Sequence, residues 1–185
     1  HYLTLSHETQ KGYLAKVMPP IRTQNDVNSV WEAIKQNQIN TIGTDHVANQ
    51  LKLKTDGDSV WDALAGFPGV GTLLPILLSE GVNKNKLSLN QLIELTSFNA
   101  SKIFGMTSKG SIEIGYDADI TIIDMKKEQK VDSFLFGGFS DYLVYDGWNL
   151  KGWPVKTIVR GETVSEDFEV VGRRGFGKLV PRILS

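Results

Sequence analysis

An aspartate and a histidine that follow a short apolar segment are the residues best placed to do chemistry in this chain. Residues 40–43 (NTIG) are typical of a short buried strand, and Thr44, Asp45 and His46 come where that strand should stop. In a parallel α/β barrel, catalytic groups gather at the C-terminal ends of strands. A carboxylate there could bind a divalent metal or accept a proton from metal-bound water. By position alone, the commoner role for Asp45 is that of a turn or cap residue.

The histidines do not add an obvious metal site to this aspartate. The chain has 3 histidines, His1, His7 and His46, and no two have the His-x-His spacing of a metal pair. We expect His7 to be solvated in a polar loop. His46 follows the candidate carboxylate, and we expect it to pack behind the site or to orient other groups rather than to bind metal.

Helices are predicted around the short strand. Apolar residues recur at helical spacing in residues 25–37, and Thr23 or Asn25 can cap this helix. Residues 47–60 are polar and irregular and are predicted to form a loop. A turn cluster at residues 66–71 leads into an apolar helix over residues 72–80.

Glycines and a capping pair are predicted to bound the later helices. Gly81 should close the apolar helix in a left-handed conformation. Ser88 and Gln91 have the spacing of a capping box for the next helix. Residues 99–104 form one more short helix, which Gly105 should close.

Strand patterns replace the helical ones after about residue 106. Period-two alternation or β-branched runs predict strands, and the signals around Gly161 predict a hairpin. The predicted strands are residues 110–115, 119–124, 156–160, 162–164 and 169–171, together with a strand-like run at residues 1–5. The tail from Gly172 is basic and rich in glycine, which is typical of an extended arm. We therefore place a boundary near residues 106–110.

Composition excludes several classes of function. The chain of 185 residues has a formal net charge of -1, which gives no strong field toward nucleic acid or an anionic membrane. It has no cysteine, so disulfides, thiolate metal sites and a cysteine nucleophile are excluded, and a cytoplasmic location is expected. The longest apolar run, residues 73–78, is far shorter than the roughly 20 residues that span a bilayer.

The chain opens at His1 without an initiator methionine and without a signal peptide pattern. We expect a chain whose beginning is missing. The alternative is a mature protein from which only the first residue was removed.

Five segments in fixed order resemble the cyclic amidohydrolases, which include dihydropyrimidinases, hydantoinases, allantoinases and dihydroorotases. The segment at residues 41–46 is similar to the "GSDH" or "GTDH" end of the last barrel strand in that family. The segments are residues 16–22 (KVMPPIR), 41–46 (TIGTDH), 66–70 (GFPGV), 96–105 (TSFNASKIFG) and 109–120 (KGSIEIGYDADI). The residues around Trp148 and Trp153 and the long tail favour a dihydropyrimidinase or hydantoinase, with allantoinase and dihydroorotase as alternatives.

The resemblance implies a fold and a division of the chain. Residues 1–106 correspond to the C-terminal part of a (β/α)8 TIM-type barrel. Residues 107–166 correspond to part of a small β-sandwich, which strands from elsewhere in the parent enzyme complete, and residues 167–185 to a C-terminal arm. The complete parent is expected to be a homo-oligomer, a dimer or tetramer. It should act on a small cyclic amide, with no nucleic-acid or membrane partner.

The resemblance also implies the chemistry. Family members hold two divalent ions, usually Zn²⁺, and Asp45 matches the strand-end residue that binds one metal and shuttles a proton. Backbone groups at Met18, Pro19, Ala65 and Gly66 match the positions that read the ring amide. Hydantoinases often have Ser where this chain has Met18, so that contact is in question. The other ligands, a His-x-His pair, a carboxylated Lys and two further His, have no counterpart here, and His1 matches a structural position.

Three interpretations remain open at this stage. The first is part of an enzyme that opens a dihydropyrimidine or hydantoin ring and is inactive as this chain alone. The second is a non-catalytic dihydropyrimidinase-like assembly protein. The third is an unrelated α/β binding domain in which Asp45 only caps a turn.

Overall fold

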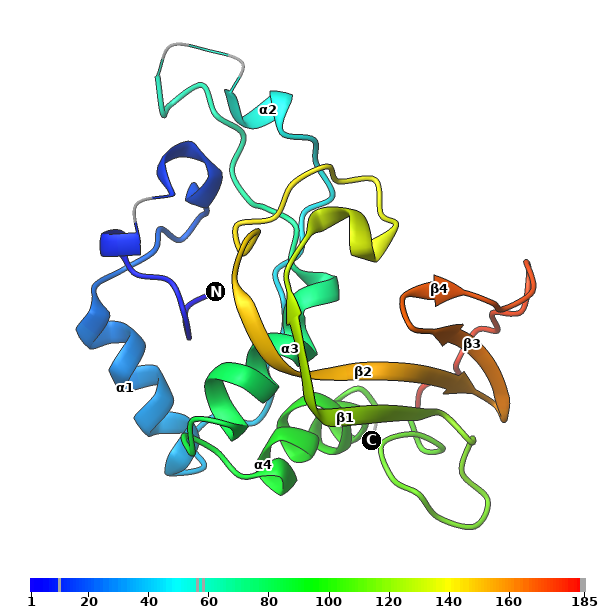
Figure 1. The fold of residues 1–185 in the computed structure, drawn as a ribbon. Coiled ribbons are helices and arrows are strands. Elements are labelled where there is room, and N and C mark those ends of the chain that lie inside the picture. The colour runs from blue at the N-terminus through cyan, green and yellow to red at the C-terminus, as the bar shows by residue number, and fades with distance from the viewer. Residues whose placement is uncertain (10, 56, 58, 184–185) are drawn as a thin grey trace.

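The computed structural model describes residues 1–185 except residues 10, 56, 58, 184 and 185. Helical elements occupy the chain up to Ile103, and an antiparallel sheet follows on the other side of the molecule (Figure 1). The helical elements are the 3-10 turns His7–Thr9, Gly12–Ala15 and Val70–Thr72, the helices α1 (Gln24–Lys35), α2 (Lys52–Thr55), α3 (Leu73–Ile76), α4 (Leu89–Ile93) and α5 (Asn99–Ile103), and the π-helical turns Leu77–Val82 and Glu94–Phe98.

Helix α1 forms as its sequence predicts. The Thr23 hydroxyl accepts a hydrogen bond from the Asp26 backbone, and the Asp26 carboxylate accepts one from the Thr23 backbone, which makes a full capping box. The helix buries Val27, Trp31 and Ile34. The indole N–H of Trp31 donates to the Leu3 carbonyl at 2.7 Å, which fixes the start of the chain against the helix.

The later helices also begin where predicted, but the proposed cap at Gly81 is wrong. Ser88 and Gln91 form the predicted capping box, and Gly105 has a positive φ of 66° after α5. Gly81 instead lies inside the π-helical turn Leu77–Val82 without a positive φ. A Cβ there would come within 2.8 Å of the Leu87 side chain, so the glycine permits close packing rather than a change of direction.

The sheet has four strands in the order β1-β2-β3-β4. All neighbours pair antiparallel. The strands are β1 (Ile120–Lys130), β2 (Asn149–Val159), β3 (Glu162–Glu166) and β4 (Glu169–Val170). The predicted hairpin around Gly161 is confirmed, since Val159 pairs with Glu162 across a two-residue turn. Arg160 and Gly161 both have positive φ, 46° and 82°, as the tight turn of a twisted hairpin requires.

Three predicted strands are absent from the described residues. Residues 110–115 form turns and irregular chain, and Ile112 and Ile114 are exposed. Residues 40–43 are not part of a ladder, although the Ile42 amide donates to the Leu95 carbonyl at 3.0 Å. Residues 1–5 form a turn that closes on the His1 carbonyl. A strand needs a hydrogen-bonded neighbour, and the described part of the chain pairs none with these segments.

One hydrophobic core joins the sheet to the helical part, and a second lies among the helices. Trp153 of β2 is 0% exposed and contacts the rings of Phe136 and Phe168. The joining core contains Leu5, Val17, Phe67, Ile76, Val131, Tyr142, Leu143, Val144, Tyr145, Leu150 and Trp153. The segments that could form a site are thus anchored on the same core as β2.

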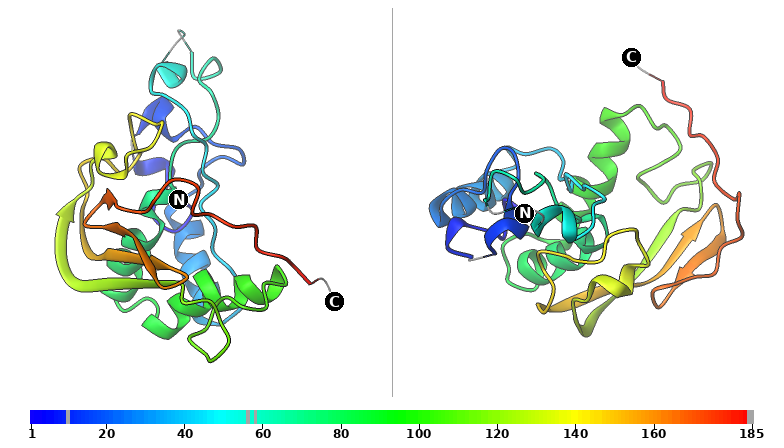
Figure 2. Two further views of the ribbon diagram at one scale, coloured as in Figure 1. Left: turned by 90° about the vertical axis from the view of Figure 1, so that its right-hand side faces the viewer. Right: turned by 90° about the horizontal axis from the view of Figure 1, so that it is seen from above.

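The loop at residues 47–60 and the tail complete the fold. The predicted loop is largely irregular but contains α2, and its residues 56 and 58 lie outside the described residues. After β4 the chain runs as an extended segment along the outside (Figure 2), where the Ile183 amide donates to the Gly105 carbonyl at 3.0 Å. Residues 184 and 185 of the predicted arm lie outside the description. None of the described helices combines the length and apolar character needed to cross a bilayer.

Candidate functional site

Asp45 lies in an exposed turn after residues 40–44, with a positive φ of 51°. Aspartate adopts this left-handed conformation more readily than most residues other than glycine. The next amide, of His46, donates to the Thr44 hydroxyl at 3.3 Å. Asp45 is exposed in this chain.

His46 attaches this turn to the segment at residues 66–70. Its Nδ1 accepts hydrogen bonds from the backbone N–H groups of Gly69 at 3.0 Å and Val70 at 3.3 Å. In addition, the Val47 amide donates to the Phe67 carbonyl at 3.1 Å, as part of an isolated parallel bridge between His46 and Phe67. Because Nδ1 is an acceptor, a neutral His46 has its proton on Nε2. The geometry supports an orienting role for this side chain.

The two segments predicted to read the substrate lie side by side. The Gly66 amide donates to the Lys16 carbonyl at 3.0 Å, which places Ala65 and Gly66 next to the chain that leads into Met18 and Pro19. The Met18 side chain is 75% exposed, whereas Gly66 is buried with a φ of 87°. A Cβ on Gly66 would lie 2.4 Å from a Val47 methyl group, so only glycine fits there.

Tyr2 bonds to one of these segments, and its pKa is influenced by Asp45. Its hydroxyl donates to the Pro19 carbonyl at 2.6 Å. Burial raises the pKa of Tyr2, and the negative charge of Asp45 raises it further, while Arg22 opposes this rise. Tyr2 thus bonds to one of these segments and lies within the electrostatic influence of Asp45. Residues 16–19, 44–49 and 64–70 together form one region, the site corner.

A mostly apolar pocket adjoins the site corner. Its lining includes His1, Thr44, Phe67, Gly69 and Tyr145. The rings of His1 and Phe67 meet edge to face with centroids 5.1 Å apart, which suits the structural role expected for His1. Burial raises the pKa of Tyr145 to about 12, so this phenol stays protonated at neutral pH.

Two buried polar residues, Asn49 in the site corner and Lys54 in α2, were not predicted from the sequence. Asn49 is 2% exposed, donates from Nδ2 to the Gly66 carbonyl at 3.3 Å, and accepts from the Tyr142 hydroxyl at 2.6 Å. Lys54 is 1% exposed. Both lie in a polar stretch whose sequence is typical of an ordinary loop. A polar run between two matched motifs was the only signal that could have indicated them.

Lys54 bonds the two substrate segments directly. Its Nζ donates to the Lys16 carbonyl at 2.9 Å and to the Leu64 carbonyl at 2.6 Å. Burial lowers the pKa of Lys54 to about 8, and the nearby charge of Lys16 adds to this effect. The Lys16 ammonium in turn donates to the Trp61 carbonyl at 2.9 Å, although the Trp61 side chain is 85% exposed.

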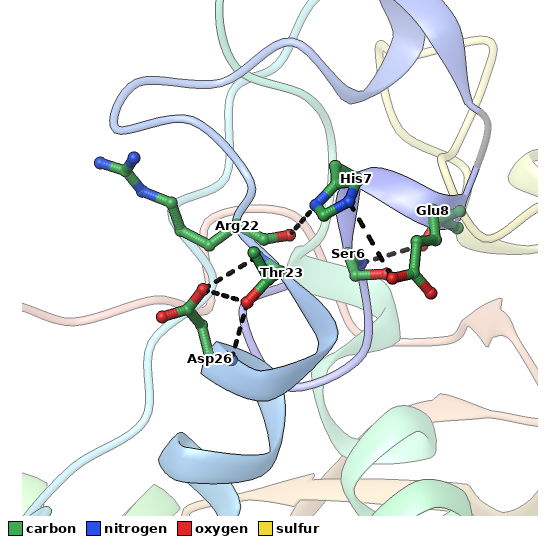
Figure 3. A network of polar contacts seen from close by, with 7 residues as sticks. Ser6, His7, Glu8, Arg22, Thr23 and Asp26 are labelled. Atoms are coloured by element: carbon green, nitrogen blue, oxygen red, sulfur yellow. Dashed lines mark hydrogen bonds and ion pairs between the residues drawn. The ribbon is translucent and has the colours of Figure 1, made fainter.

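Arg22 and His7 form a separate polar group at the start of α1 (Figure 3). The Arg22 carbonyl lies 3.3 Å from His7 Nδ1 and accepts from the His7 amide at 2.9 Å. His7 is exposed as expected, with Nε2 3.9 Å from the Glu8 carboxylate. In Figure 3 the guanidinium of Arg22 points away from the contacts that are drawn. No ion pair of Arg22 occurs within the described part of the chain.

The described residues do not make a metal centre on their own. Nowhere in residues 1–183, with residues 10, 56 and 58 left aside, do three or more His, Cys, Asp or Glu side chains come together as a metal would need. Asp45 supplies one carboxylate, whereas a metal site needs about four ligands. A binuclear centre would therefore require residues from elsewhere in a complete protein.

Comparison with known proteins decides the family. The sequence profile of the Amidohydrolase family matches residues 14–164, which is most of the chain and includes all of the site corner. The chain belongs to the amidohydrolase family. This amidohydrolase chain is 37% identical over 182 residues to an L-hydantoinase of Paenarthrobacter aurescens, and it covers 40% of that relative. It is also 37% identical over 174 residues to a dihydroorotase of Pyrococcus furiosus and again covers 40% of it.

The fold of this amidohydrolase chain also agrees with that of a solved structure. It superposes on the L-hydantoinase (dihydropyrimidinase) from Arthrobacter aurescens with a TM-score of 0.94 over 98% of the chain, at 37% identity. The chain covers 41% of that structure. The predicted fold class is confirmed, and the chain has the fold of the C-terminal part of a (β/α)8 amidohydrolase barrel followed by part of a β-sandwich. An unrelated α/β binding domain is thereby excluded.

Proposed function

We propose that the complete amidohydrolase opens the ring of a cyclic amide, a dihydropyrimidine or a hydantoin, by metal-dependent hydrolysis. One arrangement supports this most strongly: hydrogen bonds join the segment that contains Asp45 and His46 to residues 66–70, and join residues 64–66 to the segment that leads into Met18 and Pro19. The names of the similar proteins, L-hydantoinase and dihydroorotase, belong to enzymes of ring amides and point to the same reaction class.

Asp45 is the proton carrier in this proposal. In the hydrolysis, a water oxygen bonds to the ring carbonyl carbon, the C–N bond breaks, and the released nitrogen gains a proton. The Asp45 carboxylate takes the proton from the attacking water and gives it to the leaving nitrogen.

The backbone of the site corner orients the ring. Backbone carbonyl groups near Met18, Pro19, Ala65 and Gly66 can accept from the N–H of a ring amide, and the N–H groups of Met18 and Ala65 can donate to its C=O, whereas the Gly66 N–H is bonded to the Lys16 carbonyl. Several short hydrogen bonds of this kind fix the face of the ring that meets the attacking water. The buried Gly66 and its bond to the Lys16 carbonyl keep the two segments at a set spacing.

The metal requirement extends beyond this chain. We propose that the complete protein binds two divalent ions, Zn²⁺ by resemblance, with Asp45 as one ligand and the remaining ligands in other parts of that protein. The chain alone should accordingly be inactive. We further propose that the complete protein is a cytoplasmic dimer or tetramer, in which the C-terminal arm contacts a neighbouring subunit.

The test is ring opening by the complete protein on dihydrouracil, hydantoin, dihydroorotate and allantoin, with and without added Zn²⁺. We expect turnover of dihydrouracil or hydantoin that a chelator abolishes and Zn²⁺ restores. Turnover of dihydroorotate or allantoin alone would assign the protein to one of those enzyme classes instead. Absence of turnover on all four rings, in a folded protein with metal bound, would favour a non-catalytic assembly protein.

A further inference from the structure

Lys54 is a buried cation-forming group that the proposed reaction does not use. Its side chain is 1% exposed, and its Nζ reaches the carbonyl oxygens of Lys16 at 2.9 Å and Leu64 at 2.6 Å. Burial of an amine is costly, and burial lowers the pKa of this one to about 8. Lysines are rarely buried so fully, and those that are buried need hydrogen-bond partners to offset the loss of water.

The two carbonyl groups belong to the two halves of the site corner. Lys16 precedes Met18 by two positions, and Leu64 immediately precedes Ala65. The Lys16 carbonyl oxygen also accepts a hydrogen bond from the Gly66 amide at 3.0 Å. This one oxygen is therefore bonded both to Lys54 and to the opposite segment.

The backbone of α2 reinforces this arrangement. The Leu64 amide donates to the Leu53 carbonyl at 3.1 Å, next to Lys54 in the chain. The Lys54 Nζ also lies 5.9 Å from the centroid of the Phe67 ring, one residue after Gly66. Lys54 thus contacts both segments, while no regular ladder joins them among the described residues. Without Lys54, the Gly66 amide would supply the one remaining hydrogen bond among the described residues that holds Lys16 against residues 64–66.

We propose that Lys54 is a positioning residue that fixes the distance between residues 16–19 and residues 64–66 and thereby sets the affinity for the ring substrate. This inference rests on the proposed function, because it assumes that these segments hold the ring. Because the Lys54 Nζ bonds to backbone carbonyl groups and is assigned no part in the chemistry, its loss should weaken binding far more than it slows the chemical step.

The test compares Lys54→Met with Lys54→Arg in the complete protein, and uses Lys52→Met as the matched control on the exposed side of α2. We expect Lys54→Met to raise KM about tenfold or more with kcat changed less than about threefold. Lys54→Arg, which keeps N–H donors, should recover most of the loss in KM. Lys52→Met should leave both constants unchanged. If Lys54→Met does not fold, Lys54→Gln replaces it, because its shorter side chain cannot reach both carbonyl groups.

Hydrogen exchange supplies a measurement that does not depend on activity. The Gly66 amide should exchange faster in Lys54→Met, while the Ile42 amide, which donates to the Leu95 carbonyl, should be unchanged. Lower thermal stability with an unchanged KM would overturn the inference and leave Lys54 a purely structural residue. Failure of the proposed function would look different, because the wild-type protein would then open none of the rings tested.

Discussion

The site corner and the four-stranded sheet are held in place by different kinds of contact. In the sheet, β1 and β2 pair over a long antiparallel ladder, and the hairpin turn at Arg160 and Gly161 sets the register of β3. In the site corner, individual hydrogen bonds fasten one irregular segment to another: Asn49 and the neighbouring Lys54 donate to backbone carbonyl groups, and His46 accepts from the Gly69 amide. A ladder shares its stability over many bonds, whereas each bond in the site corner holds a particular backbone group.

The arrangement of the site corner therefore depends on a few polar side chains, of which Asn49 and Lys54 are buried. Loss of one ladder bond leaves its neighbours in place, because the strands are fixed on both sides of it. Loss of a buried side chain in the site corner frees a segment and leaves a carbonyl or amide without a partner. Substitutions in the sheet should therefore act on stability, and substitutions in the site corner should act on substrate binding as well.

Trp153→Ala should have the largest effect on stability, because its ring lies in the core that joins the sheet to the site corner. We expect a loss of about 3–5 kcal/mol in the free energy of unfolding. Urea denaturation followed by circular dichroism and by exchange at the Gly66 amide checks this. If the two regions share one core, both probes should shift together. A shift confined to the sheet signal would show that the regions unfold independently.

Gly66→Ala should destabilise the site corner by about 2 kcal/mol or more and also weaken substrate binding. The new methyl group would lie 2.4 Å from a Val47 side-chain carbon, at a φ of 87° that alanine disfavours. Gly161→Ala is the matched change in the sheet, at a φ of 82° with no atom within 4 Å of the added Cβ. It should cost less stability and leave KM unaltered. Equal effects of the two substitutions on KM would contradict the comparison.

Because of Lys54, the free energy of unfolding should depend on pH in the alkaline range. Burial lowers its pKa to about 8 in the folded protein, below the model-peptide value of 10.5, so the unfolded chain binds more protons between these values. Stability from this group should therefore rise by about 1–2 kcal/mol as pH increases from 8 to 10.5. The measurement is the difference in unfolding free energy between wild type and Lys54→Met across that range. A difference that is constant with pH would count against a buried amine.

The contribution of the sheet to the free energy of unfolding should depend more weakly on pH, and in the acid range. Burial acts to raise the pKa of Asp119, but hydrogen bonds from Lys109 and from the Arg160 amide outweigh it and lower the pKa below 3.8. The carboxylate therefore stabilises the fold above pH 3.8, and this contribution is lost as pH falls through the lower folded value. Asp119→Asn should cost less than about 1 kcal/mol at pH 7, because the pair is partly exposed. An acid titration of both proteins should show their difference shrink as pH falls below 3.8 and the Asp119 carboxylate is protonated, and a larger or pH-independent difference would refute this.

The sequence predicts the sheet and the helix starts better than it predicts the site corner. Capping residues such as Thr23 and Ser88, and the turn at Gly161, act within a few residues, so local pattern is enough to place them. Residues 110–115 alternate as a strand should, yet a strand exists only where a partner pairs with it. Gly81 shows the same limit, because its role depends on Leu87 and Trp31, which pack against it from outside the helix.

Within the site corner, the family resemblance indicates Asp45 and the segments at Met18, Pro19, Ala65 and Gly66. The structure brings these segments together, while their roles stay predictions. Lys54 and Asn49 could not be found by pattern, because their burial follows from contacts with Lys16, Leu64 and Gly66 that the linear sequence does not reveal.

The most direct test of the central claim is the turnover of Asp45→Asn in the complete protein, with Glu113→Gln as an exposed acidic control in the loop before β1. Asparagine keeps the shape of the side chain and tolerates the positive φ of 51°. If Asp45 moves the proton, kcat should fall by about 10³-fold or more while the melting temperature stays within a few degrees, and Glu113→Gln should behave as wild type. Turnover of Asp45→Asn close to the wild-type value would contradict the assignment of the site.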